Sequence, residues 1–164
     1  MRRFLSIILL LSTLFSLISC KEKKYEYCEF GLKLTDDYLE IDMKDTFDKA
    51  YKSERALIGI NRLSFDACLA NGLLPTHTPK KLATIYNEKI ANTDEVSDVF
   101  VSGDVPFFTY KREGEGVEYL YVATFYVSQY AYFIVTFISP NTGEGELTTE
   151  FLRIANTMYF TYDT

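Results

Sequence analysis

The sequence predicts an α+β fold, an antiparallel β-sheet of about six to seven strands with helices packed on its faces. Two observations lead to this prediction. Residues 117–127 and 130–139 are apolar at successive positions, so both faces of each strand must be buried. Two other segments carry apolar side chains at helical spacing and supply the covering layers.

Length and composition support a single globular domain. The chain has 164 residues, 48% of them hydrophobic, 24% charged and 16% aromatic. This composition is too apolar for a disordered tail and too often interrupted by charge for a polytopic membrane protein. The net charge of −6 also argues against a nucleic-acid partner, because binding to phosphates needs a basic face.

Residues 1–19 read as a cleaved signal peptide that ends at a lipid-modified cysteine. Arg2 and Arg3 precede an apolar stretch of 15 residues, 4–18, which is shorter than the roughly 20 residues of a spanning helix. Residues 17–20 (LISC) resemble the bacterial lipobox, in which the cysteine receives diacylglycerol and, after cleavage, an N-acyl chain. The alternatives are an ordinary signal peptide with a chance Cys20 at its end, or a plain N-terminal anchor.

Processing would leave an acidic protein on a short tether. Without residues 1–19 the chain has 145 residues, 15 basic and 23 acidic side chains, and a net charge of −8. Residues 20–25 form the lipidated tether and residues 26–164 the single globular domain. Lys21 in place of Asp, by resemblance to enterobacterial lipoproteins, favours the outer membrane in a Gram-negative host. In any other host we expect the outer face of the cytoplasmic membrane. The oligomeric state stays open.

The two remaining cysteines, Cys28 and Cys68, could form one disulfide outside the cytoplasm. The bridge would close a loop of about 40 residues and stabilise the fold by about 3 to 4 kcal/mol. The alternative is that one or both are small buried apolar residues. No metal site is expected, because the cysteine spacing is wrong for paired ligands and the chain has a single His.

In the first half of the domain, the sequence predicts three strands followed by a helix. Thr78 and Pro79 provide an N-cap hydroxyl and a proline at the first helical position, which predicts a helix over 79–92. The charged segment 42–54 is expected to be a connection without assigned structure. Residues 66–78 are expected to be a connection that could include one helical turn. The strands are expected at 27–34, 38–43 and 55–65.

The second half predicts four more strands, a second helix and a closing strand. In the long hairpin, one face of residues 117–127 carries Tyr121 and Phe125, and the other carries Val122 and Tyr126. The second helix is indicated by apolar residues at Leu147, Phe151, Ile154, Ala155 and Met158, and it would start near Thr148 or Thr149. The remaining elements are strands at 98–101 and 107–111, a charged turn at 112–116, the hairpin strands at 117–127 and 130–139, and a last strand at 158–162.

This order of elements resembles the PsbP-like family, which includes bacterial lipoproteins related to DcrB. The resemblance is carried by the opening F-G-L-K-L of residues 30–34, the T-P-capped helix before a long hairpin, and the closing FLRIANTMYF of residues 151–160. It implies a PsbP-like αβα sandwich. It also implies a binding or assembly protein, because members share no active site and no functional residue carries over. The sequence departs from the pattern in its long, Cys-containing connection at 66–78 and in its lack of Trp.

No catalytic motif is present. A nucleophilic triad would have to use His77, which lies between two Thr residues without a G-x-S-x-G elbow, so a solvent-facing or capping role is expected. The chain contains no H-E-x-x-H, Walker or EF-hand pattern. The G-x-G runs at 114–116 and 143–145 have acidic neighbours that repel phosphate, so turns explain both. We expect no catalytic residue and no cofactor apart from the covalent diacylglycerol and N-acyl lipid on Cys20.

Two acidic groups and the Tyr-rich strands offer weaker candidates. The acidic groups could bind Ca²⁺ if their loops converge, although solvated surface charge is the ordinary interpretation. The tyrosines could form a sugar or peptide platform, but core packing explains most of them. The acidic residues are Asp36, Asp37, Glu40 and Asp42 in one group, and Glu113, Glu115, Glu118, Glu144 and Glu146 in the other.

The sequence therefore predicts a lipid-anchored, non-enzymatic envelope protein that binds a protein partner or helps to assemble an envelope complex. The alternative is a lipid-anchored hydrolase or carbohydrate-binding module that acts on envelope polymers. A cleft with convergent carboxylates or exposed parallel aromatic rings would favour the alternative. A filled sheet would favour the binding protein.

Overall fold

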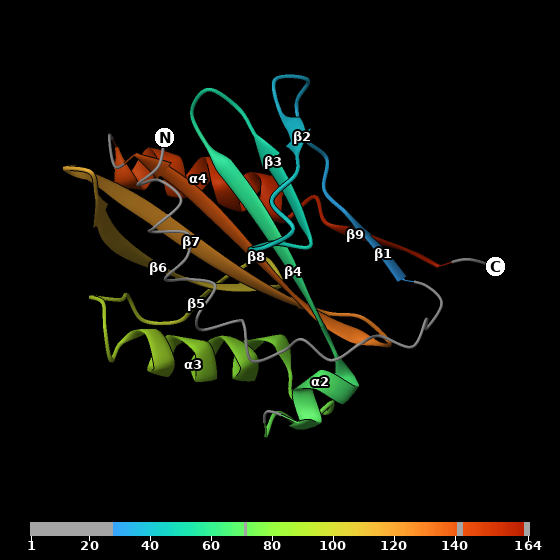
Figure 1. Ribbon diagram of the computed structural model, residues 1–164. Helices are drawn as coiled ribbons and strands as arrows, with labels where there is room; N and C mark the ends of the chain where they lie inside the picture. Colours follow the sequence, from blue (N-terminus) through green and yellow to red (C-terminus); the bar gives the residue numbers. More distant parts are fainter. Residues whose placement is uncertain (1–27, 71, 141–142, 163–164) are drawn as a thin grey trace.

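A computed structural model of the protein describes residues 28–70, 72–140 and 143–162. A seven-stranded sheet has the strand order β2-β3-β4-β8-β7-β6-β5, and β1 and β9 form a separate two-stranded ribbon (Figure 1). All neighbouring strands are antiparallel, so the predicted fold class is confirmed. The elements are β1 (Cys28–Gly31), β2 (Leu39–Ile41), β3 (Lys49–Lys52), β4 (Leu57–Ser64), α2 (Phe65–Ala70), α3 (Pro79–Ile90), β5 (Phe100–Ser102), β6 (Val105–Gly114), β7 (Val117–Val127), β8 (Ala131–Pro140), α4 (Glu144–Ala155) and β9 (Tyr159–Tyr162).

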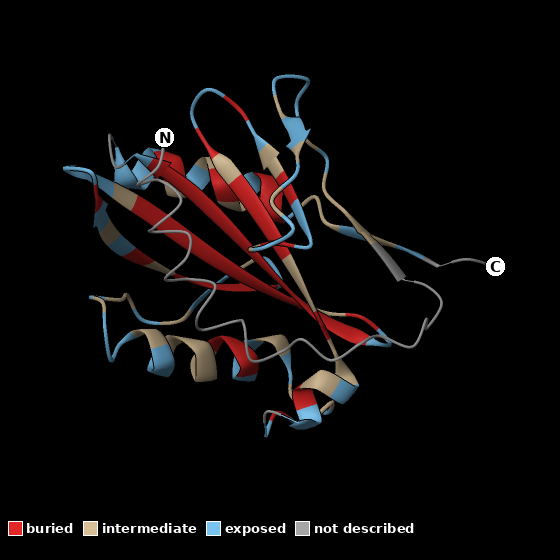
Figure 2. Cartoon of the chain, viewed as in Figure 1, coloured by how far each residue is buried: buried red, intermediate tan, exposed pale blue. Residues whose placement is uncertain are grey.

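The sheet separates two hydrophobic cores, as the two-sided apolar pattern of its central strands predicts. Buried residues are concentrated along β4, β7 and β8 (Figure 2). On β7, Tyr121 and Phe125 lie in the core that also contains Leu82 of α3. Val122 and Tyr126 lie in the core that contains Phe151 of α4. The predicted assignment of side chains to the two faces is therefore confirmed.

The helix α3 begins where the sequence predicts. The Thr78 side chain accepts a hydrogen bond from the backbone N–H of Lys81 at 3.2 Å, and Pro79 is the first helical residue. Leu82 and Ala83 are fully buried against the sheet. The helix ends at Ile90, two residues before the predicted end.

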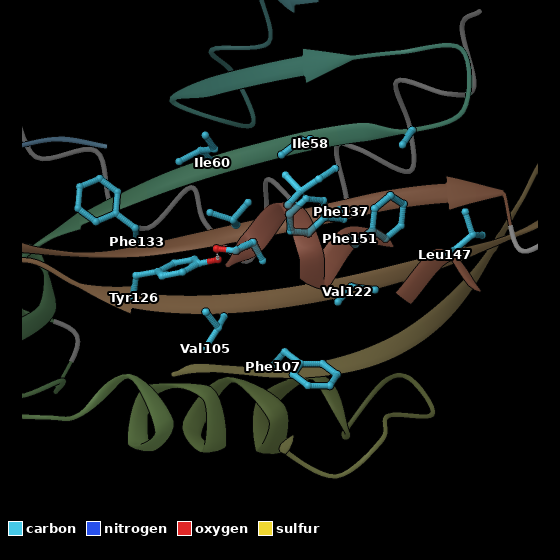
Figure 3. Close-up of a cluster of buried hydrophobic side chains, with 14 of the residues drawn as sticks. Ile58, Ile60, Val105, Phe107, Val122, Tyr126, Phe133, Phe137, Leu147 and Phe151 are labelled. Carbon is cyan, nitrogen blue, oxygen red and sulfur yellow. Dashed lines mark hydrogen bonds between the residues drawn. The ribbon is translucent and has the colours of Figure 1, made fainter. Parts of the chain in front are cut away.

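The helix α4 covers the opposite face of the sheet (Figure 3). It begins at Glu144, several residues before the predicted start, and its first turn carries acidic side chains that suit the positive end of the helix dipole. Phe151 stacks on Phe137 of β8 with 5.1 Å between ring centroids. Met158 lies beyond the end of the helix but packs against the same core, so the predicted apolar face is confirmed except at its last position.

The structure corrects the expectation that residues 42–54 form a connection without regular structure. Strand β3 lies between β2 and β4 within this segment. Ala50 is buried, whereas Lys49 and Lys52 are exposed. Phe47, just before the strand, is also buried in the core that faces α3. The strand lies near the edge of the sheet and contributes few apolar residues, although these are buried. The frequent charges of the segment therefore did not indicate a strand.

The predicted turn at 112–116 is wrong for its first three residues. Strand β6 continues to Gly114 and pairs with β7 down to Val117. The turn consists of Glu115 and Gly116, whose φ angles of 54° and 77° are both positive. Two consecutive positive φ angles match the right-handed twist of a hairpin, so the strands continue further than charge alone suggests.

The first and last strands pair with each other instead of joining the large sheet. Phe30 of β1 lies opposite Phe160 of β9. Phe30 also stacks on Phe133 of β8 with a centroid distance of 4.9 Å, which attaches the ribbon to the α4 side of the sheet.

Candidate functional site

His77 has a structural role in the loop before α3. Its Nδ1 accepts a hydrogen bond from the backbone N–H of Leu74 at 3.4 Å. Its carbonyl oxygen accepts a hydrogen bond from the Tyr132 hydroxyl at 2.6 Å. These contacts hold residues 74–77 against the sheet, which fits the expected capping role.

The first acidic group lies around the turn before β2. The Thr35 hydroxyl donates to Asp37, and Lys44 lies 3.8 Å from Asp42 with both side chains largely exposed. Exposed ion pairs of this kind contribute little to stability because water screens them. These residues act as turn and surface groups.

Part of the second acidic group does converge, but on a lysine. The Lys111 ammonium lies 2.7 Å from a Glu144 carboxylate oxygen and 4.0 Å from Glu118. The hydrogen bond from Lys111 to Glu144 raises the pKa of Lys111. Among the described residues, no three Asp, Glu, His or Cys side chains are grouped closely enough to hold a metal ion.

The most enclosed charged cluster was not predicted from the sequence. The guanidinium of Arg112 makes two hydrogen bonds to the Asp94 carboxylate, at 2.9 and 2.7 Å. Arg112 also lies over the rings of Tyr110 and Tyr121, at 5.2 and 5.8 Å from their centroids. These two rings are stacked on each other with a centroid distance of 4.7 Å. The side chains of Arg112 and Asp94 are only 16% and 12% exposed, so this ion pair is largely shielded from water.

The electrostatics of the Arg112 cluster are those of a structural clamp. Burial raises the pKa of Asp94, but hydrogen bonds from Arg112 and Thr93 outweigh this effect and lower the pKa below its ordinary value. Burial raises the pKa of Tyr110, so its hydroxyl stays neutral. Because Asp94 follows α3 and Arg112 lies on β6, the pair fastens the end of the helix to the sheet. Tyr110 and Arg112 lie two positions apart on β6, and this spacing could have indicated the cluster. Because Arg112 was predicted to lie in the turn at 112–116, the cluster was not predicted.

Of the three cysteines, the structure describes the side chain of Cys68 alone. Cys68 lies on α2, is 2% exposed and forms no disulfide with another described side chain. Its Sγ lies 3.9 Å from the carbonyl oxygen of Leu63, and burial raises its pKa to about 11. The side chain of Cys28 lies outside the described residues, so its pairing with Cys68 stays a prediction. Cys20 and the tether also lie outside them, and lipidation stays a prediction.

Most aromatic side chains of the central strands fill the two cores. Tyr110, Tyr121, Tyr126 and Tyr132 are all buried. The Tyr126 hydroxyl donates a hydrogen bond, at 3.0 Å, to the carbonyl oxygen of Ala155, the last residue of α4 (Figure 3). These rings are therefore packing groups and do not form an exposed platform.

Five of the eight exposed large apolar side chains among the described residues lie in two regions of the fold. Phe100 and Val101 are 51% and 50% exposed on β5, an edge strand of the sheet. Leu69, Leu74 and Tyr130 are exposed where β4 meets α2 and β7 turns into β8. Exposed apolar residues that form a contiguous patch mark sites of contact with proteins, membranes or ligands.

Solved structures share this architecture. The solution structure of cyanobacterial PsbP (CyanoP) from Synechocystis sp. PCC 6803 matches with a TM-score of 0.51 and 8% identity, over 89% of this chain and 99% of that one. The fold is PsbP-like. This result confirms the fold that the sequence resemblance implies.

Two further structural matches come from other bacteria. LpqN, described as involved in cell envelope biogenesis of Mycobacterium tuberculosis, matches with a TM-score of 0.50 and 11% identity, over 82% of this chain and 84% of that one. A crystal structure from Bacteroides thetaiotaomicron has a TM-score of 0.50 and 12% identity over 82% of this chain. The chain spans 46% of the length of that protein.

The sequence itself matches no family model and no curated protein. The three structural likenesses have identities too low to carry over any site residue, so they establish the fold alone. No helix among the described residues is both long and apolar enough to cross a bilayer.

Proposed function

We propose that this protein is a lipid-anchored, non-enzymatic binding protein of the bacterial cell envelope. The lipobox-like LISC of residues 17–20 supports the anchor. The PsbP-like fold supports a binding role, and one protein with this fold, LpqN, is described as involved in cell envelope biogenesis. In a Gram-negative host the anchor would hold the protein on the outer membrane, and otherwise on the outer face of the cytoplasmic membrane.

The observation that carries the binding role is the edge strand β5. Among the described residues β5 pairs only with β6, so no described strand lies along its other edge. Phe100 packs on Phe107 with 5.9 Å between centroids but still exposes half of its surface, and Val101 beside it is equally exposed. An edge strand with apolar side chains is a template for an extended segment of a partner protein.

Elsewhere in the fold, hydrogen bonds between enclosed polar groups support a rigid scaffold. Buried hydroxyls are bonded to backbone oxygens, as in Tyr126 to Ala155 and Tyr132 to His77. The enclosed charges of Arg112 and Asp94 satisfy each other. These groups hold elements together, which suits a protein that presents a surface of fixed shape.

A photo-crosslinking residue at position 100 of the lipidated protein in its native host tests the binding role. We expect one defined protein adduct from position 100 and none from position 88, where the exposed Glu88 of α3 serves as a matched control. Equal adducts from both positions, or none from either, would contradict a partner at β5. Hydrolysis of isolated cell-wall polymer by the purified protein would instead support the hydrolase alternative.

The lipid anchor is tested separately by the substitution Cys20→Ala. We expect the protein to leave the membrane fraction and to lose metabolic labelling with palmitate. If both membrane association and labelling persist in this variant, the lipoprotein assignment is wrong.

A further inference from the structure

Three exposed apolar side chains lie at the end of the sheet where β4 leads into α2. Leu69 and Leu74 are 54% and 51% exposed, and Tyr130 in the turn between β7 and β8 is 44% exposed. Ser64 and Ala131 form the last pair between β4 and β8, so α2 and this turn lie at the same end of the sheet. We call these three residues the α2 surface.

The fold holds the α2 surface in place without using its side chains. Cys68 and Leu73 are buried, while their sequence neighbours Leu69 and Leu74 face outward. The Tyr132 hydroxyl donates to the carbonyl oxygen of Leu74 at 2.9 Å. The exposed leucines are therefore positioned by backbone contacts and are not required by the core.

The chain that leads to the proposed anchor leaves the domain toward this same end. Phe30 stacks on Phe133, which pairs with Arg62, two residues before the end of β4. From Phe30 the chain continues to Tyr38, whose hydroxyl meets Ser53 at the turn between β3 and β4, the far end of the sheet. Cys28 precedes Phe30 and must lie in the opposite direction, toward α2.

The length of the tether limits how far this end can be from the lipid. Eight residue steps separate Cys20 from Cys28, which is at most roughly 29 Å for a fully extended chain. Lys21, Lys23 and Lys24 in this segment are attracted to anionic lipid headgroups. The end of the domain that carries the α2 surface is therefore kept close to the bilayer.

The chemistry of the α2 surface suits a lipid interface. Leucine side chains enter the boundary of the acyl region, and tyrosine is favoured where one end of the side chain is apolar and the other is wet. Lys80 and Lys81 at the start of α3 add positive charge, whereas Asp66 on α2 opposes it. The apolar contact is therefore the main attraction.

We propose that the α2 surface, formed by Leu69, Leu74 and Tyr130, rests on the bilayer that holds the lipid of Cys20. This inference depends on the lipid anchor of the proposed function. It adds an orientation to that function, in which α2 faces the lipid.

The test uses the full lipidated protein in vesicles of phosphatidylethanolamine and phosphatidylglycerol at 3:1. A photo-crosslinking p-benzoylphenylalanine is placed at position 69, 74 or 130, with position 100 on β5 as the matched exposed apolar control. After illumination, lipid adducts are counted by mass spectrometry. We expect at least fivefold more lipid adduct from each position of the α2 surface than from position 100.

A second variant shows whether the contact needs the leucines. The double substitution Leu69→Ser and Leu74→Ser should leave the fold intact, because both side chains are exposed, and should lower the adduct from position 130 at least threefold. The control Leu39→Ser, which changes an exposed leucine on β2, should leave that adduct unchanged.

Flotation of the vesicles separates failure of the anchor from failure of the docking. Protein that does not float with the vesicles would overturn the lipid anchor and the docking with it. Protein that floats but gives equal lipid adducts from positions 69 and 100 would overturn the docking alone. A crosslink from position 69 to a second copy of the chain or to another protein in place of lipid would also overturn it.

Discussion

Gly59 on β4 is the position where the packing of the fold can be tested most directly. A Cβ built at this residue would overlap three atoms of the Phe47 ring, far inside van der Waals contact. Gly59 does not have a positive φ, so its backbone conformation is one that alanine adopts without strain. The substitution Gly59→Ala therefore tests the contact with Phe47 and not the backbone.

The expected cost follows from the surroundings of that ring. Phe47 is 3% exposed and packs in the core that faces α3, so the ring cannot move away without displacing other buried groups. Adding a methyl group to a filled core costs about 1 to 3 kcal/mol of unfolding free energy. The substitution Phe47→Ala, which removes the ring, should cost about 3 to 5 kcal/mol.

The double variant decides whether the two effects share one cause. With the ring absent, the methyl group added at position 59 has room and reduces the conformational freedom of the unfolded chain, so its cost should fall to about zero. The double variant should thus be more stable than the sum of the single effects predicts, by about 1 to 3 kcal/mol. Gly145→Ala is the matched control, because a Cβ there meets nothing within 4 Å. Within the first turn of α4 it should leave stability unchanged or raise it by up to about 1 kcal/mol.

Urea unfolding of the soluble chain that begins after Cys20 measures these differences. The chain has no Trp and 13 Tyr, so tyrosine emission and far-ultraviolet circular dichroism report the transition. Strict additivity of Gly59→Ala and Phe47→Ala would refute the packing of Phe47 on Gly59, and with it the placement of the segment before β3.

Three further predictions concern the polar groups inside the fold. Asp94→Asn should cost about 1 to 3 kcal/mol at pH 7, measured by urea unfolding. Because the folded-state pKa of Asp94 is lowered, its contribution is present above the unfolded pKa of about 4 and is lost as the pH falls through the folded value. The difference from the unchanged protein should therefore shrink toward pH 3, and a constant difference would contradict the ion pair. Tyr126→Phe should lower stability by about 1 kcal/mol, because it leaves the carbonyl oxygen of Ala155 without its donor, whereas a neutral outcome would mean that water replaces the hydroxyl. The Cys68 thiol, with a pKa of about 11, should react with a disulfide reagent at pH 8 at least 100-fold more slowly in the native protein than in urea. If instead no thiol reacts even in urea without a reductant, the bridge between Cys28 and Cys68 exists.

The central hairpin and α3 could be predicted from the sequence because their signals are local. On β7 the faces defined by Tyr121 and Val122 alternate over the whole strand, and only burial on both sides accounts for apolar residues at successive positions. The hydroxyl of Thr78 and the ring of Pro79 mark the start of α3 within two residues. Such patterns need no knowledge of distant parts of the chain.

The features that were missed depend on contacts between distant residues. Nothing near Phe30 indicates that it pairs with Phe160, 130 residues later, because strand register is set by the partner and not by the strand alone. The salt bridge between Arg112 and Asp94 also joins segments that are separated in sequence by a full strand. The candidate surfaces are harder still, since exposure of Phe100 or Leu69 depends on which elements cover them in the folded chain.

The α2 surface by itself would bind a membrane only weakly. Half-exposed side chains of the kind found at Leu69, Leu74 and Tyr130 would each gain about 1 kcal/mol on entering a lipid interface, or about 3 kcal/mol together. Such a gain corresponds to a dissociation constant of several millimolar, which is too weak to hold a soluble protein on a membrane. A short tether supplies an effective concentration in the same millimolar range, so the anchored domain would spend a large share of its time docked. The soluble chain without Cys20 should therefore not bind vesicles, although the same three residues orient the anchored protein. Docking at α2 would leave the β5 edge free for a partner, because β5 lies at the opposite edge of the sheet from the strands β2 and β3 and is separated from β4 by three strands.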